Sequence, residues 1–205
     1  VHDIVQKVMA NMQISGSVSG MHGVFKDMND AINASIEAQK KVCTMTLDQR
    51  EQIISLIRKK THENAEILAN MGVNETGMGN VGDKILKHHL TADKVPGTED
   101  ISTIAWSGDR GLTLVEMGPF GVIGAITPAT NPSETVICNC IGMLAGGNTV
   151  VFNPHPNAKK TTIYTINMIN EASIEAGGPD NIAVTVEAPT LDTSAIMMKH
   201  PSIHL

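Results

Sequence analysis

The second half of the chain alternates strand-like and helix-like segments in a regular order. Short apolar runs follow Gly or Asn, and amphipathic stretches with helical spacing lie between them. The pattern predicts strands over 112–116, 121–127, 148–153 and 181–187, with a Pro/Gly turn between the first two, and helices over 132–144, 161–176 and 190–198. This order is typical of a parallel, doubly wound sheet, which binds ligands at the carboxyl ends of its strands.

The first half of the chain is predicted to be mostly helical. Apolar residues recur at helical spacing over residues 25–42, 47–71 and 83–93. The second of these helices has Thr46 and Gln49 in capping-box spacing at its start and Gly72 at its end. The fold class that follows is α/β, with N-terminal helices before a Rossmann-like, doubly wound and mostly parallel sheet that is truncated where a further strand is due.

The N-terminus has the pattern of a separate segment. Residues 1–12 place their apolar side chains on one stripe of a helix, and a Gly/Ser-rich stretch follows up to residue 23. We predict an amphipathic docking helix and flexible linker over 1–23, and an incomplete α/β domain over 24–205. The alternative is a terminal helix that packs on its own domain.

Composition excludes several classes of partner. Aromatic residues make up only 2% of the chain, the net charge is −6, and the basic residues cluster only at "RKK" (58–60). Nucleic-acid binding therefore has neither a stacking platform nor an electrostatic footprint. No apolar run approaches the length that crosses a bilayer. Three cysteines, Cys43, Cys138 and Cys140, suit neither a disulfide framework nor a zinc site, and they favour a reducing, intracellular setting.

Two motifs are predicted to have no cofactor role. "GMGNVG" (77–82) fits the dinucleotide fingerprint G-x-G-x-x-G, but a helix rather than a strand precedes it. His88 and His89 are adjacent on a helix, point in different directions and have no Glu or Cys at ligand spacing, so we interpret them as a solvated pair. No metal site is predicted.

One stretch carries a resemblance to a known family. "EMGPFGVIGAITPATNPSETVICNCIGMLAGGNTVVFNPHPNAKKTT" (116–162) resembles the aldehyde dehydrogenase superfamily, and within it the CoA-acylating, microcompartment-associated branch. Members of the superfamily end a strand in Pro-Trp-Asn-Phe-Pro, and "PATNP" (128–132) stands at that place here. The resemblance extends over about residues 25–205, with a weaker match at "ETG" (75–77).

The resemblance implies a catalytic role for Asn131. Such enzymes attack an aldehyde with a Cys thiolate, and the resulting oxyanion must be stabilised before hydride leaves for the nicotinamide. Asn131 would donate its side-chain NH2 to that oxyanion, and Thr127, Pro128 and Ala129 would contact the cofactor. The alternative use of Asn131 is a helix N-cap, which is common for Asn before Pro. The two roles do not exclude each other.

The next strand end departs from the hydrolytic members of the family. Those members carry Lys and Glu in "K-P-x-E", which hold the adenosine ribose, whereas this chain has Asn153-Pro154-His155-Pro156. The resemblance to the acylating branch implies a weaker grip on NAD, so that NAD can leave and coenzyme A can enter as co-substrate. The alternative for His155 is a turn residue. Pro189 and Thr190 are expected along the adenine side of the same cleft.

The nucleophilic Cys of the family is expected beyond residue 205. Cys138 and Cys140 lie on an apolar helix, where we interpret them as buried thiols, and Cys43 lies near the end of an early helix. We therefore expect the N-terminal part of an NAD-dependent, CoA-acylating aldehyde dehydrogenase for a short-chain aldehyde, inactive as an isolated chain. The alternatives are a hydrolytic aldehyde or semialdehyde dehydrogenase and a non-catalytic, truncated dinucleotide-binding or shell-docking protein.

The resemblance implies that residues 1–23 are a targeting helix and linker and that residues 24–205 are an incomplete dinucleotide-binding domain. It also implies partners and a location. We expect a homo-oligomer in the cytoplasm, inside a bacterial microcompartment, with residues 1–12 as the contact to a shell protein. We expect no nucleic-acid or membrane partner.

Overall fold

The computed structural model describes residues 20–204. The predicted targeting helix over 1–12 and most of the predicted linker lie outside the described residues. No helix within 20–204 combines the length and the apolar character that a membrane crossing requires.

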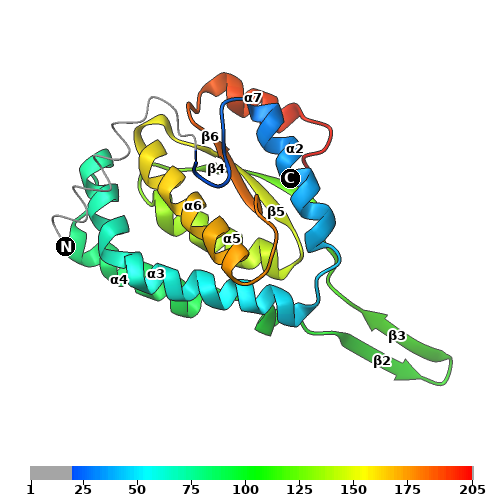
Figure 1. Cartoon of the computed structure of the whole chain (residues 1–205). Coiled ribbons are helices and arrows are strands. Elements are labelled where there is room, and N and C mark those ends of the chain that lie inside the picture. Colours follow the sequence, from blue (N-terminus) through cyan, green and yellow to red (C-terminus); the bar gives the residue numbers. More distant parts are fainter. Residues whose placement is uncertain (1–19, 205) are drawn as a thin grey trace.

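Helices fill the first part of the described chain and alternate with strands in the second part (Figure 1). The first part holds β1 (Val24–Phe25), α2 (Met28–Val42), α3 (Leu47–Thr76), α4 (Val81–Lys94) and η1 (Thr98–Asp100). A hairpin of β2 (Ile104–Gly108) and β3 (Gly111–Val115) follows. The second part holds β4 (Val122–Thr127), α5 (Pro132–Ala145), β5 (Thr149–Pro154), η2 (Pro156–Ala158), α6 (Lys159–Glu175), β6 (Ala183–Val186) and α7 (Leu191–Lys199).

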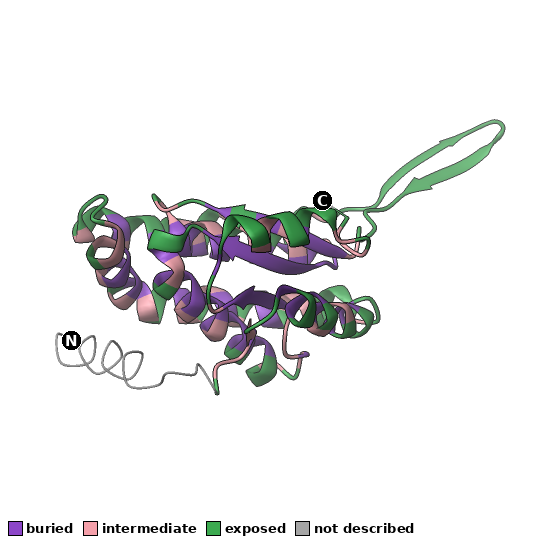
Figure 2. Cartoon of the chain, turned by 90° about the horizontal axis from the view of Figure 1, so that it is seen from above, coloured by how far each residue is buried: buried purple, intermediate pink, exposed green. Residues whose placement is uncertain are grey.

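The main sheet is parallel and is covered by helices on both faces, as the alternation predicted. Its strand order is β1-β6-β5-β4, and all of its pairings are parallel. Helices α5 and α6 lie on one face with α3 behind them, and α2 and α7 lie on the other (Figures 1 and 2). At the outer edge of β4, Val122 forms a parallel bridge with Ile203, where the sequence predicted a further strand.

Two apolar cores follow from the alternation of side chains along the central strands. Val150 and Phe152 of β5 point into a core shared with α3, α5 and α6, whereas Val151 between them points into the core under α2 and α7. Every β5 residue is buried, and its central residues Val150, Val151 and Phe152 are apolar on both faces, as expected for a sheet covered on both sides. The sheet is therefore a rigid platform for the loops at its carboxyl edge.

The hairpin departs from the sequence prediction. The segments 112–116 and 121–127 do not pair across a Pro/Gly turn. Instead β3 pairs antiparallel with β2, which the sequence analysis did not identify as a strand. The hairpin projects from the body with every residue exposed (Figure 2). The connection to β4 is fixed separately, because the Asn148 side-chain oxygen accepts hydrogen bonds from the backbone N–H groups of Phe120 and Gly121 at 2.7 and 3.0 Å.

Helix α3 begins as predicted and ends later than predicted. Thr46 and Gln49 form the capping box. The helix continues through Gly72, which is buried against the side chain of Lys84, and ends at Gly77, whose φ of 68° closes the helix in the left-handed region. Gly72 thus provides space for a side chain rather than a helix end.

The extra turn of α3 brings Glu75 to the start of α6. Its carboxylate accepts hydrogen bonds from the backbone N–H groups of Lys160 and Thr161 at 2.7 and 2.8 Å, and from the Thr161 hydroxyl at 2.7 Å. The local N-cap residue of α6, Ala158, makes no side-chain cap bond. Glu75 therefore supplies the missing N-cap of α6 from a distant part of the chain. Its negative charge also interacts favourably with the positive end of the helix dipole.

We expect Glu75→Ala to lower the free energy of unfolding by about 2 kcal/mol, because it removes a charged acceptor from three donors. Thermal unfolding of the protein that carries this chain measures the loss. The matched control is Glu66→Ala, which removes an exposed carboxylate from the same helix. Equal melting temperatures for the two variants would contradict the distant-cap interpretation.

Candidate functional site

The ends of three parallel strands bring the predicted cofactor residues to one edge of the sheet. Thr127 at the end of β4 pairs in register with Pro154 at the end of β5. The backbone N–H of His155 donates to the Thr127 carbonyl at 3.0 Å, so the two loops leave the sheet side by side. Pro189 and Thr190 follow the end of β6, the neighbour of β5. This carboxyl edge is the usual ligand site of such sheets.

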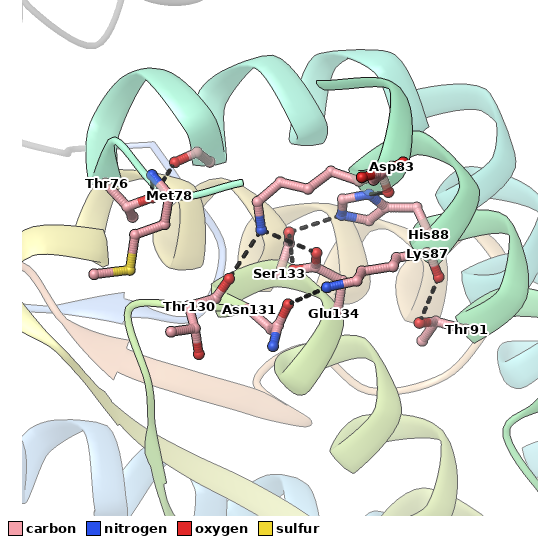
Figure 3. Close-up of polar contacts among 12 residues, drawn as sticks. Thr76, Met78, Asp83, Lys87, His88, Thr91, Thr130, Asn131, Ser133 and Glu134 are labelled. Atoms are coloured by element: carbon pink, nitrogen blue, oxygen red, sulfur yellow. Dashed lines mark hydrogen bonds and ion pairs between the residues drawn. The ribbon is translucent and has the colours of Figure 1, made fainter. Parts of the chain in front are cut away.

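Asn131 occupies the N-cap position of α5, but its side chain does not act as a cap. Its φ and ψ are −139° and 65°, and no side-chain cap hydrogen bond forms. The side-chain oxygen accepts a hydrogen bond from Lys87 Nζ at 3.3 Å (Figure 3). Within the described residues the side-chain NH2 has no hydrogen-bond partner. The arrangement leaves a polarised N–H donor available to a ligand.

The Asn131 side chain lines a pocket between α4 and α5. The pocket has a volume of about 330 Å³ and an apolar contribution from Leu90. It is lined by Lys87, Leu90, Thr91, Asn131, Glu134, Thr135, Cys138 and Asn139. A small molecule with one polar group and an apolar tail fits this lining.

The cysteines differ from their sequence interpretation at one position. Cys140 is buried as expected, but Cys138 is exposed and lines the pocket, because it lies on the face of α5 that turns away from the sheet. Burial raises the pKa of both thiols above its ordinary value. A thiol with a raised pKa is protonated at neutral pH and is a poor nucleophile. Cys138 therefore lies near Asn131 without the activation that nucleophilic attack requires.

The interpretation of His88 and His89 as a solvated pair is wrong for His88. Its side chain is fully buried; Nδ1 lies 2.7 Å from the Lys84 carbonyl oxygen and Nε2 lies 2.8 Å from Ser133 Oγ. Burial lowers the pKa of His88 below its ordinary value. His88 follows Lys84 by one helical turn and so shares its inward face, while His89 lies partly exposed.

A buried ion pair also lies at this site, and the sequence analysis missed it. Lys84 Nζ is 3.2 Å from Glu134 Oε1, and their side chains are 3% and 8% exposed. No local spacing links the two residues, which lie 50 positions apart. The sequence shows that Lys84 is one helical turn before His88 and that Glu134 is three residues after Asn131. These spacings indicate a shared site only once α4 is known to pack beside α5.

The remaining predicted residues differ in what they can offer a ligand. Asn153 is buried: its Nδ2 donates to Ser194 Oγ at 2.6 Å and its Oδ1 accepts from Thr193 Oγ1 at 2.7 Å. These bonds tie β5 to the start of α7, where Thr190 is the N-cap. Pro154 and Pro189 are buried, whereas Pro128 and His155 are exposed at the edge.

The remaining predictions concern the turn role of His155, the motif "GMGNVG" and metal binding. His155 Nδ1 accepts a hydrogen bond from the Asn157 backbone N–H at 3.1 Å, so its side chain caps η2. "GMGNVG" lies between two helices, since Gly77 ends α3 and Asn80 caps α4, which confirms the helical context predicted for it. In residues 20–204 no group of three or more His, Cys, Asp or Glu is arranged to hold a metal ion.

The chain is similar to proteins of known activity. It is 48% identical over 191 residues to an acetaldehyde dehydrogenase (acetylating) from Bilophila wadsworthia, covering 93% of this chain and 39% of that protein. A propionaldehyde dehydrogenase from the fucose utilisation microcompartment of Clostridium phytofermentans is 72% identical, with a TM-score of 0.88, over 89% of this chain and 42% of that chain. A Rhodopseudomonas palustris propionaldehyde dehydrogenase, solved with bound CoA and an acylated cysteine, is 46% identical, with a TM-score of 0.86, over 88% of this chain and 42% of that chain.

These comparisons show the family and the extent of the match. The chain spans about two fifths of the length of the relatives, 39% of the Bilophila protein and 42% of the Clostridium chain. Residues 12–205 match the aldehyde dehydrogenase family. This match covers most of the chain and agrees with the parallel α/β fold, so the chain belongs to the aldehyde dehydrogenase family.

Proposed function

We propose that this chain is the N-terminal, cofactor-binding part of a CoA-acylating aldehyde dehydrogenase. The complete reaction converts a short-chain aldehyde, CoA and NAD+ into acyl-CoA, NADH and a proton. The observation that carries the proposal is the Asn131 side chain, which stands at the head of α5 without capping it and lines a pocket. The acylating relatives at 46% and 48% identity support the choice of this branch of the family.

The role proposed for Asn131 follows from its hydrogen bonds. When a thiolate adds to an aldehyde carbonyl, the carbonyl oxygen becomes an oxyanion that needs a fixed donor. Because Lys87 occupies the Asn131 side-chain oxygen, the NH2 group is the part of the amide that remains for the oxyanion. The attacking cysteine would come from residues beyond 205, since the raised pKa of Cys138 and Cys140 does not favour either as the nucleophile.

The nicotinamide dinucleotide would lie along the carboxyl edge of the sheet and accept the hydride. Thr127 supports this placement, because its buried hydroxyl oxygen at the end of β4 has no hydrogen-bond partner among the described residues. Pro128, Ala129, Pro154 and Pro189 would form the walls of the site, and His155 and Thr190 lie exposed at its rim.

Asn153 would act on the cofactor indirectly. Its amide is already used by Thr193 and Ser194, so its role would be to fix Thr190 at the edge of the site rather than to bind the ribose. With neither Lys nor Glu of "K-P-x-E" present, the ribose has few anchors here. A loosely held dinucleotide favours its exchange for CoA, which takes the acyl group as co-substrate. This is why we favour the acylating reaction over the hydrolytic one.

The pocket between α4 and α5 would hold the aldehyde tail. Its volume of about 330 Å³ suits a short chain, and the apolar side of Leu90 would cover that chain.

The β2–β3 hairpin supports a homo-oligomer. Trp106, Leu112 and Leu114 are 57%, 64% and 59% exposed, and none of them contributes to either core. An exposed apolar hairpin of this kind is typical of a contact surface. A second copy of the chain is the partner we propose, because the hairpin's strand edges and apolar side chains are the same on both copies and can form a symmetric contact.

The location proposed for the complete protein is a bacterial microcompartment in the cytoplasm. The Clostridium relative comes from such a compartment. Residues 1–23 would carry the targeting helix and linker, with residues 1–12 as the contact to a shell protein, and residues 24–205 would form the incomplete dinucleotide-binding domain.

In the complete protein, Asn131→Ala is expected to lower kcat by on the order of 10² to 10³, the usual loss for one oxyanion donor. The melting temperature should stay near that of the unmodified protein, because the side chain makes no cap bond. CoA-dependent NADH formation measures kcat, and the exposed Asn74→Ala variant on α3 is the control. A loss of stability with kcat changed less than about threefold would assign Asn131 to helix capping instead.

Replacing Trp106 and Leu112 together by Glu is expected to reduce the oligomer to smaller species without unfolding the body, because the hairpin lies outside both cores. Light scattering of the complete protein after size-exclusion chromatography gives the mass. Arg110→Glu at the exposed turn serves as the charge control. An unchanged mass for the double variant would remove the hairpin from the proposed interface.

A further inference from the structure

One face of α4 is directed at the loop that carries Asn131. Lys84, Lys87 and His88 are spaced three and four residues apart, so they share one side of the helix. All three make polar contacts with residues of the segment 130–134, and Figure 3 shows those of Lys87 and His88. The function proposed above uses Asn131 and its contact with Lys87, but it assigns no role to Lys84 or His88.

Lys84 holds the main chain beside Asn131. Its ammonium donates to the Thr130 carbonyl oxygen at 2.9 Å and to Glu134 Oε1 at 3.2 Å. The stem of the side chain packs over the glycines at 72 and 79, where an added Cβ would lie 3.8 and 3.5 Å from it. A buried ammonium is costly unless its partners are fixed, so the Thr130 carbonyl has one preferred position.

His88 fixes the next polar group of the segment. A carbonyl oxygen can only accept, so the hydrogen of the His88 ring is on Nδ1, which faces the Lys84 carbonyl. Burial lowers the pKa of the ring. Its Nε2 lies 2.8 Å from Ser133 Oγ, which also lies 3.2 Å from Glu134 Oε2, so Ser133 stands between the two side chains. Both sides of Asn131 along the chain, Thr130 before it and Ser133 after it, are thus tied to α4.

Lys87 acts on the Asn131 side chain itself. Its ammonium contacts the side-chain oxygen at 3.3 Å and sets which end of the amide faces α4. An amide without this contact can rotate by half a turn and present an oxygen where the donor is needed. Lys84 therefore controls where Asn131 stands, and Lys87 controls which way its amide points.

We propose that Lys84 and Lys87 are positioning residues for the oxyanion donor, and that Glu134 is the buried counter-ion that holds Lys84 in place. The inference rests on the function proposed for Asn131. If the ion pair only joined α4 to α5, removing it would not change kcat through Asn131.

The test is a double-mutant cycle with Asn131→Ala in the complete protein. Lys84→Met combined with Glu134→Gln removes both charges at similar volume, so no unpaired charge is buried and the fold should persist. We expect kcat to fall by about 10- to 100-fold with the aldehyde KM nearly unchanged, because the donor is misplaced rather than the substrate. In the Asn131→Ala background the same pair should change kcat less than about twofold, because no donor remains to misplace.

Lys87→Met provides a second variant that does not depend on a buried pair. Lys87 is exposed, so its removal should not unfold the protein even if the Lys84 and Glu134 replacements do. We expect kcat to fall about two- to tenfold, the loss of one modest hydrogen bond, and to stay unchanged in the Asn131→Ala background. Lys94→Met, an exposed lysine at the end of the same helix, is the control.

The outcomes separate this inference from the function on which it rests. If Asn131→Ala leaves kcat unchanged, the proposed function fails. If Asn131→Ala lowers kcat but the lysine variants do not, or if they lower it equally in both backgrounds, the positioning role is wrong. Circular dichroism and melting temperature identify a Lys84 variant that is unfolded, and the Lys87 cycle then decides the question alone.

Discussion

The parallel pairing of β4 with β5 is the constraint on which the site depends. It places Thr127 beside Pro154, and the bond from the His155 N–H to the Thr127 carbonyl keeps the two following loops together. Because β5 is buried throughout and most of β4 is buried, this edge has little freedom to move. The loop that carries Asn131, four residues after Thr127, therefore begins at a fixed position.

A second support comes from outside the sheet. Helix α4 belongs to the helical first half of the chain, yet it holds Thr130, Asn131 and Ser133 through two lysines and a histidine. The site is therefore a joint product of the two halves: the sheet sets where the loop begins, and α4 sets how its polar groups are directed. Glu75, at the C-terminal end of α3, joins the same halves because it caps α6.

The sequence predicted the elements better than the contacts between them. Periodicity and local caps, such as the pair Thr46 and Gln49, are local signals, and the parallel sheet follows from the order of its elements. The partner of β3 was mispredicted, because a strand pattern does not specify which strand it pairs with. The end of α3 was wrongly predicted at Gly72. The sequence does not distinguish a glycine that leaves room for the Lys84 side chain from a glycine that ends a helix.

At the candidate site, the sequence pointed to Asn131 but not to the residues that contact it. Asn131 stood out because of the prolines around it, and the resemblance pointed to its chemistry. The burial of His88 and the pairing of Lys84 with Glu134 depend on how α4 packs against α5, which no spacing along the chain encodes. The exposure of Cys138 depends in the same way on which face of α5 lies away from the sheet.

The central claim is that the Asn131 side-chain NH2 is the donor to the reacting oxygen. The most direct measurement is a crystal structure of the complete protein with its acyl group trapped on the nucleophilic cysteine. The account predicts Asn131 Nδ2 at about 3 Å from the acyl oxygen, with Lys87 still at the side-chain oxygen. An acyl oxygen held by other donors, with the Asn131 amide turned away or capping α5, would contradict it.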